Sequence, residues 1–295
     1  MAVLYFIVRK IKSKEILLFS SEISKEVFME MSKNLEKILE SSDKKEKIIY
    51  SPAKIQGDTI EIIDFFKVKN YEQFSKILKN IPGPSISEIM DSSDSLKSDY
   101  EMWGYCYVSE IDGKKRLFFK KYKSQSLLKT NCLRMIFSNG HFTSVNKSIF
   151  TLDYDVDCFM ENGVLYILKK NNFELLFDFH EEIAEISKKG YQIIKNEIKI
   201  ECDGFEKWCE QGGTVARKLA SIYLNKHYEK MKHDKISEII EMHNLKIKYN
   251  FYKKSIAFDS LSKSRIEYWE ILKLFDDDYL HSYLTNNLYE SENKN

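Results

Sequence analysis

Residues 103–122 read WGYCYVSEIDGKKRLFFKKY, and this stretch decides what kind of sheet the chain builds. Its centre, Asp112-Gly113, lies between two runs rich in aromatic and apolar residues. Such a dipeptide favours the positive φ angles of a two-residue type I′ turn, which joins antiparallel strands and fixes their register. One face then pairs Val108 with Leu117 and Cys106 with Phe119. We therefore expect this apolar face to belong to the core.

The opposite face of the same hairpin mixes aromatic rings with positive charge. Its cross-strand pairs are Tyr107 with Phe118, Tyr105 with Lys120, Trp103 with Tyr122, and Ser109 with Arg116. Rings of this kind stack on bases and the cations contact phosphates. The candidate DNA-binding residues here are Tyr105, Lys114, Lys115, Arg116, Lys120, Lys121 and Lys123. The alternative is a set of aromatic cross-strand pairs covered by another element, with lysines at the rim.

Two further turn signals of the same kind follow, Asn139-Gly140 and Asn162-Gly163. Three successive hairpins predict a mainly antiparallel sheet of about six strands. Helical periodicity takes over afterwards, and the expected helices are Phe173–Ser187, Thr214–Lys226, Lys235–His243 and Ile266–Phe275. A hairpin-rich sheet followed by a C-terminal set of helices indicates an α+β fold.

The first 95 residues or so alternate strand-like and helix-like runs. The expected strands are Val3–Val8, Glu15–Phe19, Lys47–Tyr50 and Ile60–Val68, and the expected helices are Ser21–Leu39 and Tyr71–Leu78. The run Ile81-Pro82-Gly83-Pro84, with the polar stretch 91–95 after it, is typical of a boundary between domains. We predict a small N-terminal domain with α/β alternation over residues 1–95, and a second domain over 96–295.

Composition narrows the class of protein. The 295 residues carry a net charge of +1, so binding to nucleic acid must depend on local separation of charge. No apolar stretch approaches the roughly 20 residues that span a bilayer. Five cysteines without a Cys-x-x-Cys pair are typical of reduced thiols in a cytoplasmic protein.

The predicted helix over 214–226 offers a second cationic surface. Val215, Leu219 and Ile222 share one face at 100° per residue. Arg217, Lys218 and Asn225 fall on the opposite arc, where they can follow a phosphate backbone. The alternative is an ordinary solvated helix surface.

An acidic row gives the main enzymatic hypothesis. Asp153, Asp155 and Asp157 alternate along a predicted strand and point to one side, as ligands of a divalent metal in a nuclease would. The competing interpretation is a charge pair between Asp155 and Lys170 on a solvated sheet face. We expect Asp276-Asp277-Asp278 to cap a helix over Tyr279–Leu284. Motifs of other catalytic classes and of cofactor binding are missing from the sequence, so we expect no cofactor.

Several short motifs, in order along the chain, resemble one known family. They are Phe150-Thr151-Leu152-Asp153, Val156-Asp157, Val164–Leu168, Asn172–Phe177, Ala216–Ala220 and Leu272–Thr285. Over roughly residues 115–290 the chain resembles the KwaB-like family of Kiwa, a bacterial anti-phage system. The resemblance implies a DNA-binding effector without established catalytic residues, which self-associates and works with the membrane-embedded partner KwaA to block phage propagation. It also implies a cytoplasmic protein that this partner can tether to the inner face of the membrane.

The sequence therefore predicts a non-enzymatic defence protein that binds DNA, in duplex form, through phosphate contacts and without reading sequence. A metal-dependent nuclease is the first rival hypothesis. The second is an interaction scaffold that touches no nucleic acid and uses the aromatic hairpin face as a protein interface.

Overall fold

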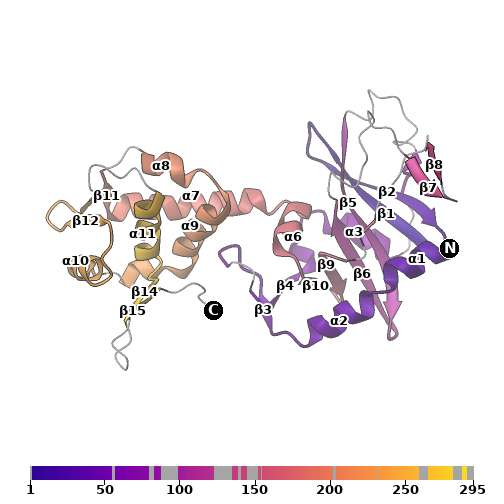
Figure 1. The fold of residues 1–295 in the computed structure, drawn as a ribbon, viewed down its shortest axis with the longest axis horizontal. Helices are drawn as coiled ribbons and strands as arrows, with labels where there is room; N and C mark the ends of the chain where they lie inside the picture. Colours follow the sequence, from indigo (N-terminus) through magenta and orange to yellow (C-terminus); the bar gives the residue numbers. More distant parts are fainter. Residues whose placement is uncertain are drawn as a thin grey trace. The chain divides into compact units, whose positions relative to one another are not determined.

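The computed structural model describes residues 2–54, 57–79, 83–87, 99–122, 135–138, 141–144, 152–153, 155–201, 204–230, 232–258, 265–281 and 288–290. Lys123 lies outside these residues. The chain forms two compact units (Figure 1). The first contains residues 1–50 and 58–178, and the second contains residues 51–57 and 179–295.

The first unit is built on an eight-stranded sheet in the order β2-β1-β5-β6-β9-β10-β4-β3. All neighbours are antiparallel except β3 and β4, which are parallel. The strands are β1 (Ala2–Lys10), β2 (Ile16–Ile23), β3 (Lys47–Ile49), β4 (Ile60–Asp64), β5 (Tyr100–Ile111), β6 (Lys114–Lys121), β9 (Cys158–Glu161) and β10 (Val164–Ile167).

The hairpin predictions are confirmed where the turns are described. Asp112 and Gly113 have φ of 54° and 69°, and Asn162 and Gly163 have φ of 51° and 80°. The β5–β6 register is the expected one, with Tyr105 opposite Lys120. The remaining predicted turn, Asn139-Gly140, lies outside the described residues. The strands before and after it, β7 (Met135–Ser138) and β8 (His141–Ser144), form a separate two-stranded ladder. The large sheet therefore gains its remaining strands from the N-terminal part of the chain.

That origin corrects the predicted domain boundary near residue 95. Strand β1 pairs with β5 and β4 pairs with β10, so residues from both sides of the boundary share one sheet. The division between the two compact units falls after Asp178 instead. The α+β class itself is confirmed.

Helices cover both faces of the large sheet. On one face, α1 (Lys25–Ser32) and α2 (Leu35–Asp43) bury Met31, Leu35 and Leu39 against aromatic side chains of β5, β6 and β9. The single helix predicted over 21–39 is wrong, because β2 runs to Ile23 and the Ser24 hydroxyl caps α1 by accepting the Val27 N–H. The other face carries η1 (Phe65–Lys67), α3 (Tyr71–Leu78) and α6 (Lys170–Leu176).

The second unit is mostly helical. Its elements are α7 (His180–Glu197), β11 (Lys199–Ile200), α8 (Gly204–Cys209), α9 (Gly213–Asn225), η3 (His227–Lys230), α10 (His233–Met242), β12 (Ile247–Asn250), β13 (Ser255–Phe258), α11 (Arg265–Phe275), β14 (Tyr279–His281) and β15 (Leu288–Glu290). The core includes Phe205, Trp208, Leu219, Ile236 and Phe275. Strands β11, β13 and β12 form a small sheet beside the helices, and β14 pairs with β15.

Most predicted helices of this unit are confirmed, with two corrections. The helix expected over 173–187 is split, because Asp178 takes a left-handed φ of 66° between α6 and α7. The helix expected over 279–284 is wrong at its start, since Tyr279–His281 form strand β14.

Candidate nucleic-acid interface

The mixed face of the β5–β6 hairpin is buried. Tyr105 is 2% exposed, Arg116 6% and Lys120 1%. The covering elements are α1 and α2, whose Phe28 meets the Tyr107 ring edge-on at 6.3 Å between centroids. The alternative stated for this face, cross-strand aromatic pairs under another element, is what the structure shows. Tyr105, Arg116 and Lys120 are therefore not available to DNA in this fold.

Lys120 is neutralised by the acidic row. Its ammonium pairs with Asp155, lies 3.3 Å from Asp157 Oδ1 and lies 3.4 Å from Asp153 Oδ2. Asp157 is fully buried and also accepts the Lys121 backbone N–H at 2.7 Å and the Asn172 amide at 2.9 Å. The Lys120 ammonium therefore balances part of the negative charge of these carboxylates.

The hypothesis of a metal-dependent nuclease concerns the same three aspartates, Asp153, Asp155 and Asp157. Within the described ranges, no group of three or more acidic, histidine or cysteine side chains is arranged to hold a metal ion. Asp155 also pairs with Lys169 and not with Lys170, because β10 ends at Ile167 and Lys170 opens α6. Lys170 instead pairs with the buried Glu61 of β4, 2.6 Å away.

The tip of this hairpin keeps two exposed lysines. Lys114 pairs with Glu161 at 3.1 Å, and the Arg116 guanidinium lies 2.5 Å from the same carboxylate. Burial alone would raise the pKa of Glu161, but hydrogen bonds and charge from Lys114 and Arg116 lower it below its usual value. The exposed Lys115 donates to the Leu78 carbonyl. Both lysines remain accessible, and the Glu161 carboxylate balances part of the charge of Lys114.

Lys121 is half-buried at the other end of β6. Its ammonium lies 3.8 Å from the centre of the Trp103 ring, and the Arg9 guanidinium lies 3.3 Å from the same ring centre. Burial lowers the pKa of Lys121 to about 8, with a further contribution from Arg9 that Glu101 opposes. Lys121 is thus part of a cation–π cluster and not a free cation at the rim.

The basic residues of α9 are largely engaged within the second unit. Lys218 pairs with Asp276 at 2.6 Å and with Asp278, and the Ser221 hydroxyl donates to Asp276 at 2.8 Å. Both aspartates are buried after α11, so their predicted role as a helix cap is wrong. Elsewhere on α9, Arg217 donates to the Pro52 carbonyl at 3.1 Å, and the exposed Asn225 donates to Ser221 at 2.9 Å.

A different hairpin combines exposed aromatic rings with exposed positive charge. Residues 245–257 contain Lys246, Lys248, Lys253 and Lys254 and no acidic residue. All four lysines are exposed. Lys253 and Lys254 lie in the turn that joins β12 to β13, and Lys246 and Lys248 precede that turn. In that turn Tyr252 is 96% exposed and Phe251 is 51% exposed. We call residues 246–255 the basic-aromatic hairpin.

The strand register explains why the hairpin has one polar face. Ile247 and Tyr249 of β12, with Ile256 and Phe258 of β13, pack into the core of the second unit. Strand alternation therefore turns Lys248 and Asn250 to the opposite face. A hollow of about 460 Å³ lies there, and it is lined by Glu201, Ser237, Lys248, Asn250, Tyr252 and Lys253 among others.

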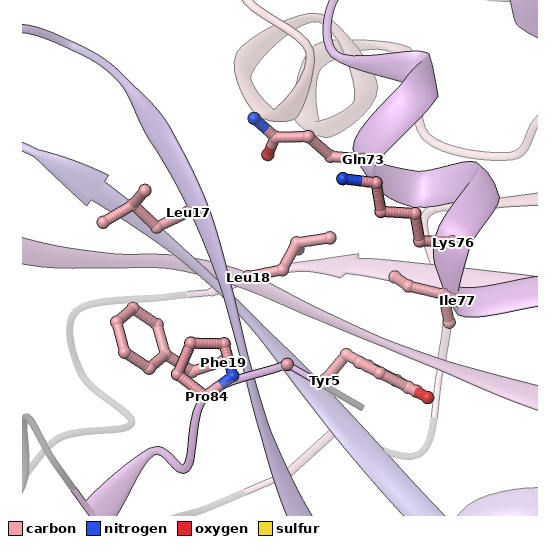
Figure 2. A pocket seen from close by; sticks show the side chains of 9 residues that line it. Tyr5, Leu17, Leu18, Phe19, Gln73, Lys76, Ile77 and Pro84 are labelled. Carbon is pink, nitrogen blue, oxygen red and sulfur yellow. The ribbon is translucent and has the colours of Figure 1, made fainter. Parts of the chain in front are cut away.

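A second hollow of about 430 Å³ lies in the first unit and has different chemistry (Figure 2). Helix α3 and strands β1 and β2 line it, mainly with apolar side chains such as Leu18 and Ile77. Gln73 and Lys76 extend from α3 toward the strands (Figure 2). With one lysine and a mainly apolar wall, this hollow does not suit a polyanion.

Sequence reasoning missed the basic-aromatic hairpin because its turn carries no Asn-Gly or Asp-Gly signal. Two features could have found it. Residues 245–250 alternate apolar and polar side chains, and the basic residues of the stretch 245–257 have no acidic neighbour within it.

Comparison with known proteins supplies the family. The model of the family described as Kiwa protein KwaB-like matches residues 101–285, more than half of the chain. The chain belongs to this family. It is accordingly a Kiwa anti-phage defence protein, from a system that includes partner proteins. No curated protein and no solved structure matches the chain.

The KwaB-like match begins in β5 and reaches past β14, so it includes the basic-aromatic hairpin and the Lys218–Asp276 contact. Strands β1 to β4 lie outside the match and extend the large sheet at both of its edges. Among the helices that the structure describes, none is long and apolar enough to cross a membrane.

Proposed function

We propose that this KwaB-like protein binds DNA without strong sequence specificity, and that the basic-aromatic hairpin makes the principal contacts. The observation that supports this most is the exposure of Lys246, Lys248, Lys253 and Lys254 on one short hairpin without acidic neighbours in sequence. Lysines placed in this way contact phosphates and release condensed counterions, which favours binding to any sequence.

The hairpin is better suited to this role than the two surfaces first considered. Arg116, Lys120 and Lys218 are buried or mostly buried beside carboxylates. Within the described part of the chain, neither Lys253 nor Lys254 forms an ion pair with its side chain. Lys114 and Lys115 at the tip of β5–β6 form a second, smaller cationic site in the proposal.

The proposal extends to the defence pathway that the resemblance implies. DNA binding by the hairpin would block phage propagation in cooperation with the membrane-embedded partner KwaA. Self-association of the protein remains a prediction.

The test compares three double variants that lose the same charge. Lys253→Gln/Lys254→Gln removes cations from the hairpin, Lys114→Gln/Lys115→Gln removes them from the β5–β6 tip, and Lys12→Gln/Lys33→Gln is the control. The side chains of the control pair are 91% and 69% exposed and belong to the first unit. Binding of each protein to a labelled duplex is measured by fluorescence anisotropy over a range of salt concentrations.

We expect the hairpin variant to bind more weakly to every DNA sequence. Its slope of log affinity against log salt should fall by about 0.9 for each phosphate contact that is lost. The β5–β6 variant should show a smaller change, and the control should match the wild type. Equal effects in all three variants would show that only net charge matters and would remove the hairpin assignment. Incubation of plasmid with protein and Mg²⁺ addresses the nuclease rival, since a binder retards DNA without nicking it.

A further inference from the structure

The aromatic residues of the hairpin turn are not explained by folding. Tyr252, at 96% exposed, contributes almost no buried area, and Phe251 is half exposed beside it. A single exposed ring is ordinary on a protein surface. Here two consecutive rings stand between lysines, 5.9 Å apart and nearly perpendicular at 81°. The arrangement leaves ring faces in contact with solvent at the turn that holds Lys253 and Lys254.

Phosphate contacts alone do not use these rings. In a duplex the bases stack on one another, and their faces are closed to a side chain. Unpaired bases offer open faces, and aromatic side chains stack on them with little dependence on base identity. Tyr252 and Phe251 therefore add binding energy only when the DNA supplies unpaired bases.

The hollow beside the turn has the size and chemistry for such a base. Its volume of about 460 Å³ is within the range of about 300–1,000 Å³ typical of small-ligand sites. Lys248 and Lys253 supply positive charge for a phosphate, and Asn250 and Glu201 supply groups that can bond to base edges. The Asn250 side-chain oxygen accepts the Lys253 N–H at 3.0 Å, which fixes the amide at the rim of the hollow.

From this geometry we infer that the basic-aromatic hairpin takes unpaired bases, with Tyr252 and Phe251 stacking on them and one nucleotide entering the hollow. Single-stranded DNA is then bound more tightly than duplex DNA with the same number of phosphates. The inference rests on the proposed function, because it assigns a form of DNA to the same hairpin.

The test measures binding of single-stranded oligothymidylate and of a duplex with equal phosphate count. The variants are Tyr252→Ala, Phe251→Ala and Tyr252→Phe, with Phe66→Ala as the control for loss of an exposed ring, since Phe66 is 63% exposed in the first unit. We expect each alanine in the turn to weaken single-strand binding by roughly tenfold and to leave duplex binding within about twofold. Tyr252→Phe and Phe66→Ala should bind as the wild type does.

A second measurement uses only the wild-type protein, so that it does not depend on variant folding. A 2-aminopurine base in the single strand loses fluorescence when it stacks on a ring, and the protein should quench it. Equal affinity for both DNA forms, no quenching, or aromatic variants that weaken both forms alike would overturn the inference while DNA binding stands. If neither single-stranded nor duplex DNA binds, the proposed function itself is overturned.

Discussion

Replacement of Lys120 by methionine is the most direct test of the buried charge cluster in the first unit. Methionine keeps most of the apolar stem and removes the ammonium that lies among Asp153, Asp155 and Asp157. Asp157 is fully buried, whereas the side chains of Asp153 and Asp155 are 38% and 47% exposed. The loss therefore falls mainly on Asp157, because water can screen the other two carboxylates.

The expected loss in the free energy of unfolding depends on the partners that Asp157 retains. Removing one partner of a buried ion pair typically costs about 3–5 kcal/mol, because the other charge stays buried without compensation. Asp157 still accepts the Lys121 N–H and the Asn172 amide, and Lys169 lies 4.0 Å away. We therefore expect the lower end, about 3 kcal/mol. In urea this is a fall of roughly 1–2 M in the midpoint, for a slope of about 2–3 kcal/mol per molar.

The assay must report on the first unit alone, because a chain with two compact units need not unfold in one step. Hydrogen exchange of peptides from β6 and β9, measured by mass spectrometry at increasing urea, meets this need. Lys12→Met is the control, since an exposed substitution should change stability by less than about 0.5 kcal/mol. Adding Asp157→Asn to Lys120→Met should recover much of the loss, because the buried negative charge is then gone.

A loss below about 1 kcal/mol for Lys120→Met would refute this reasoning. It would mean that the three carboxylates are well solvated, and that this end of the sheet is open to solvent. The mixed face of β5–β6 would then again be a candidate DNA surface.

Two further predictions concern stability, one for each unit. Because burial lowers the pKa of Lys121 from 10.5 to about 8, the unfolded chain binds more protons between these values, so the free energy of unfolding should rise with pH there. Urea titrations at several pH values should show this rise, and Lys121→Met should flatten it. Gly190→Ala should destabilise the second unit by about 1–3 kcal/mol, because a Cβ built there lies 1.9 Å from the Leu219 carbonyl oxygen and forces α7 away from α9. Thermal denaturation should show this loss of stability. Gly57→Ala is the neutral control, because nothing lies within 4 Å of a Cβ built at Gly57.

Local signals in the sequence correctly predicted the β5–β6 hairpin and its register. A two-residue turn with positive φ at both positions leaves only one alignment of the strands, so Asp112-Gly113 determines that Tyr105 faces Lys120. Exposure of that face is a different matter. It depends on Met31 and Leu35, which come from helices far earlier in the chain. No local pattern records which helix covers which face of a sheet.

The basic face of α9 was misjudged for the same reason. In the sequence, Lys218 has no acidic residue within four positions on either side, so on an isolated helix its charge is solvated. The chain brings Asp276 and Asp278 back to Lys218 after α11, and the ion pair forms between residues 58 or more positions apart. Because of this long-range pairing, Lys218 has a structural role in the second unit instead of the expected role in binding.

These corrections share a physical cause that also identifies the better DNA-binding candidate. The chain holds 46 basic and 45 acidic side chains, so most of its cations can find an anion when the fold forms. Lys120 and Lys218 do so by meeting acidic residues distant in sequence, and their charge is unavailable to a polyanion. A near-neutral protein attracts DNA where the fold keeps the two signs of charge apart. The turn of the basic-aromatic hairpin meets that condition, because Lys253 and Lys254 stand in solvent there and neither forms an ion pair within the described residues.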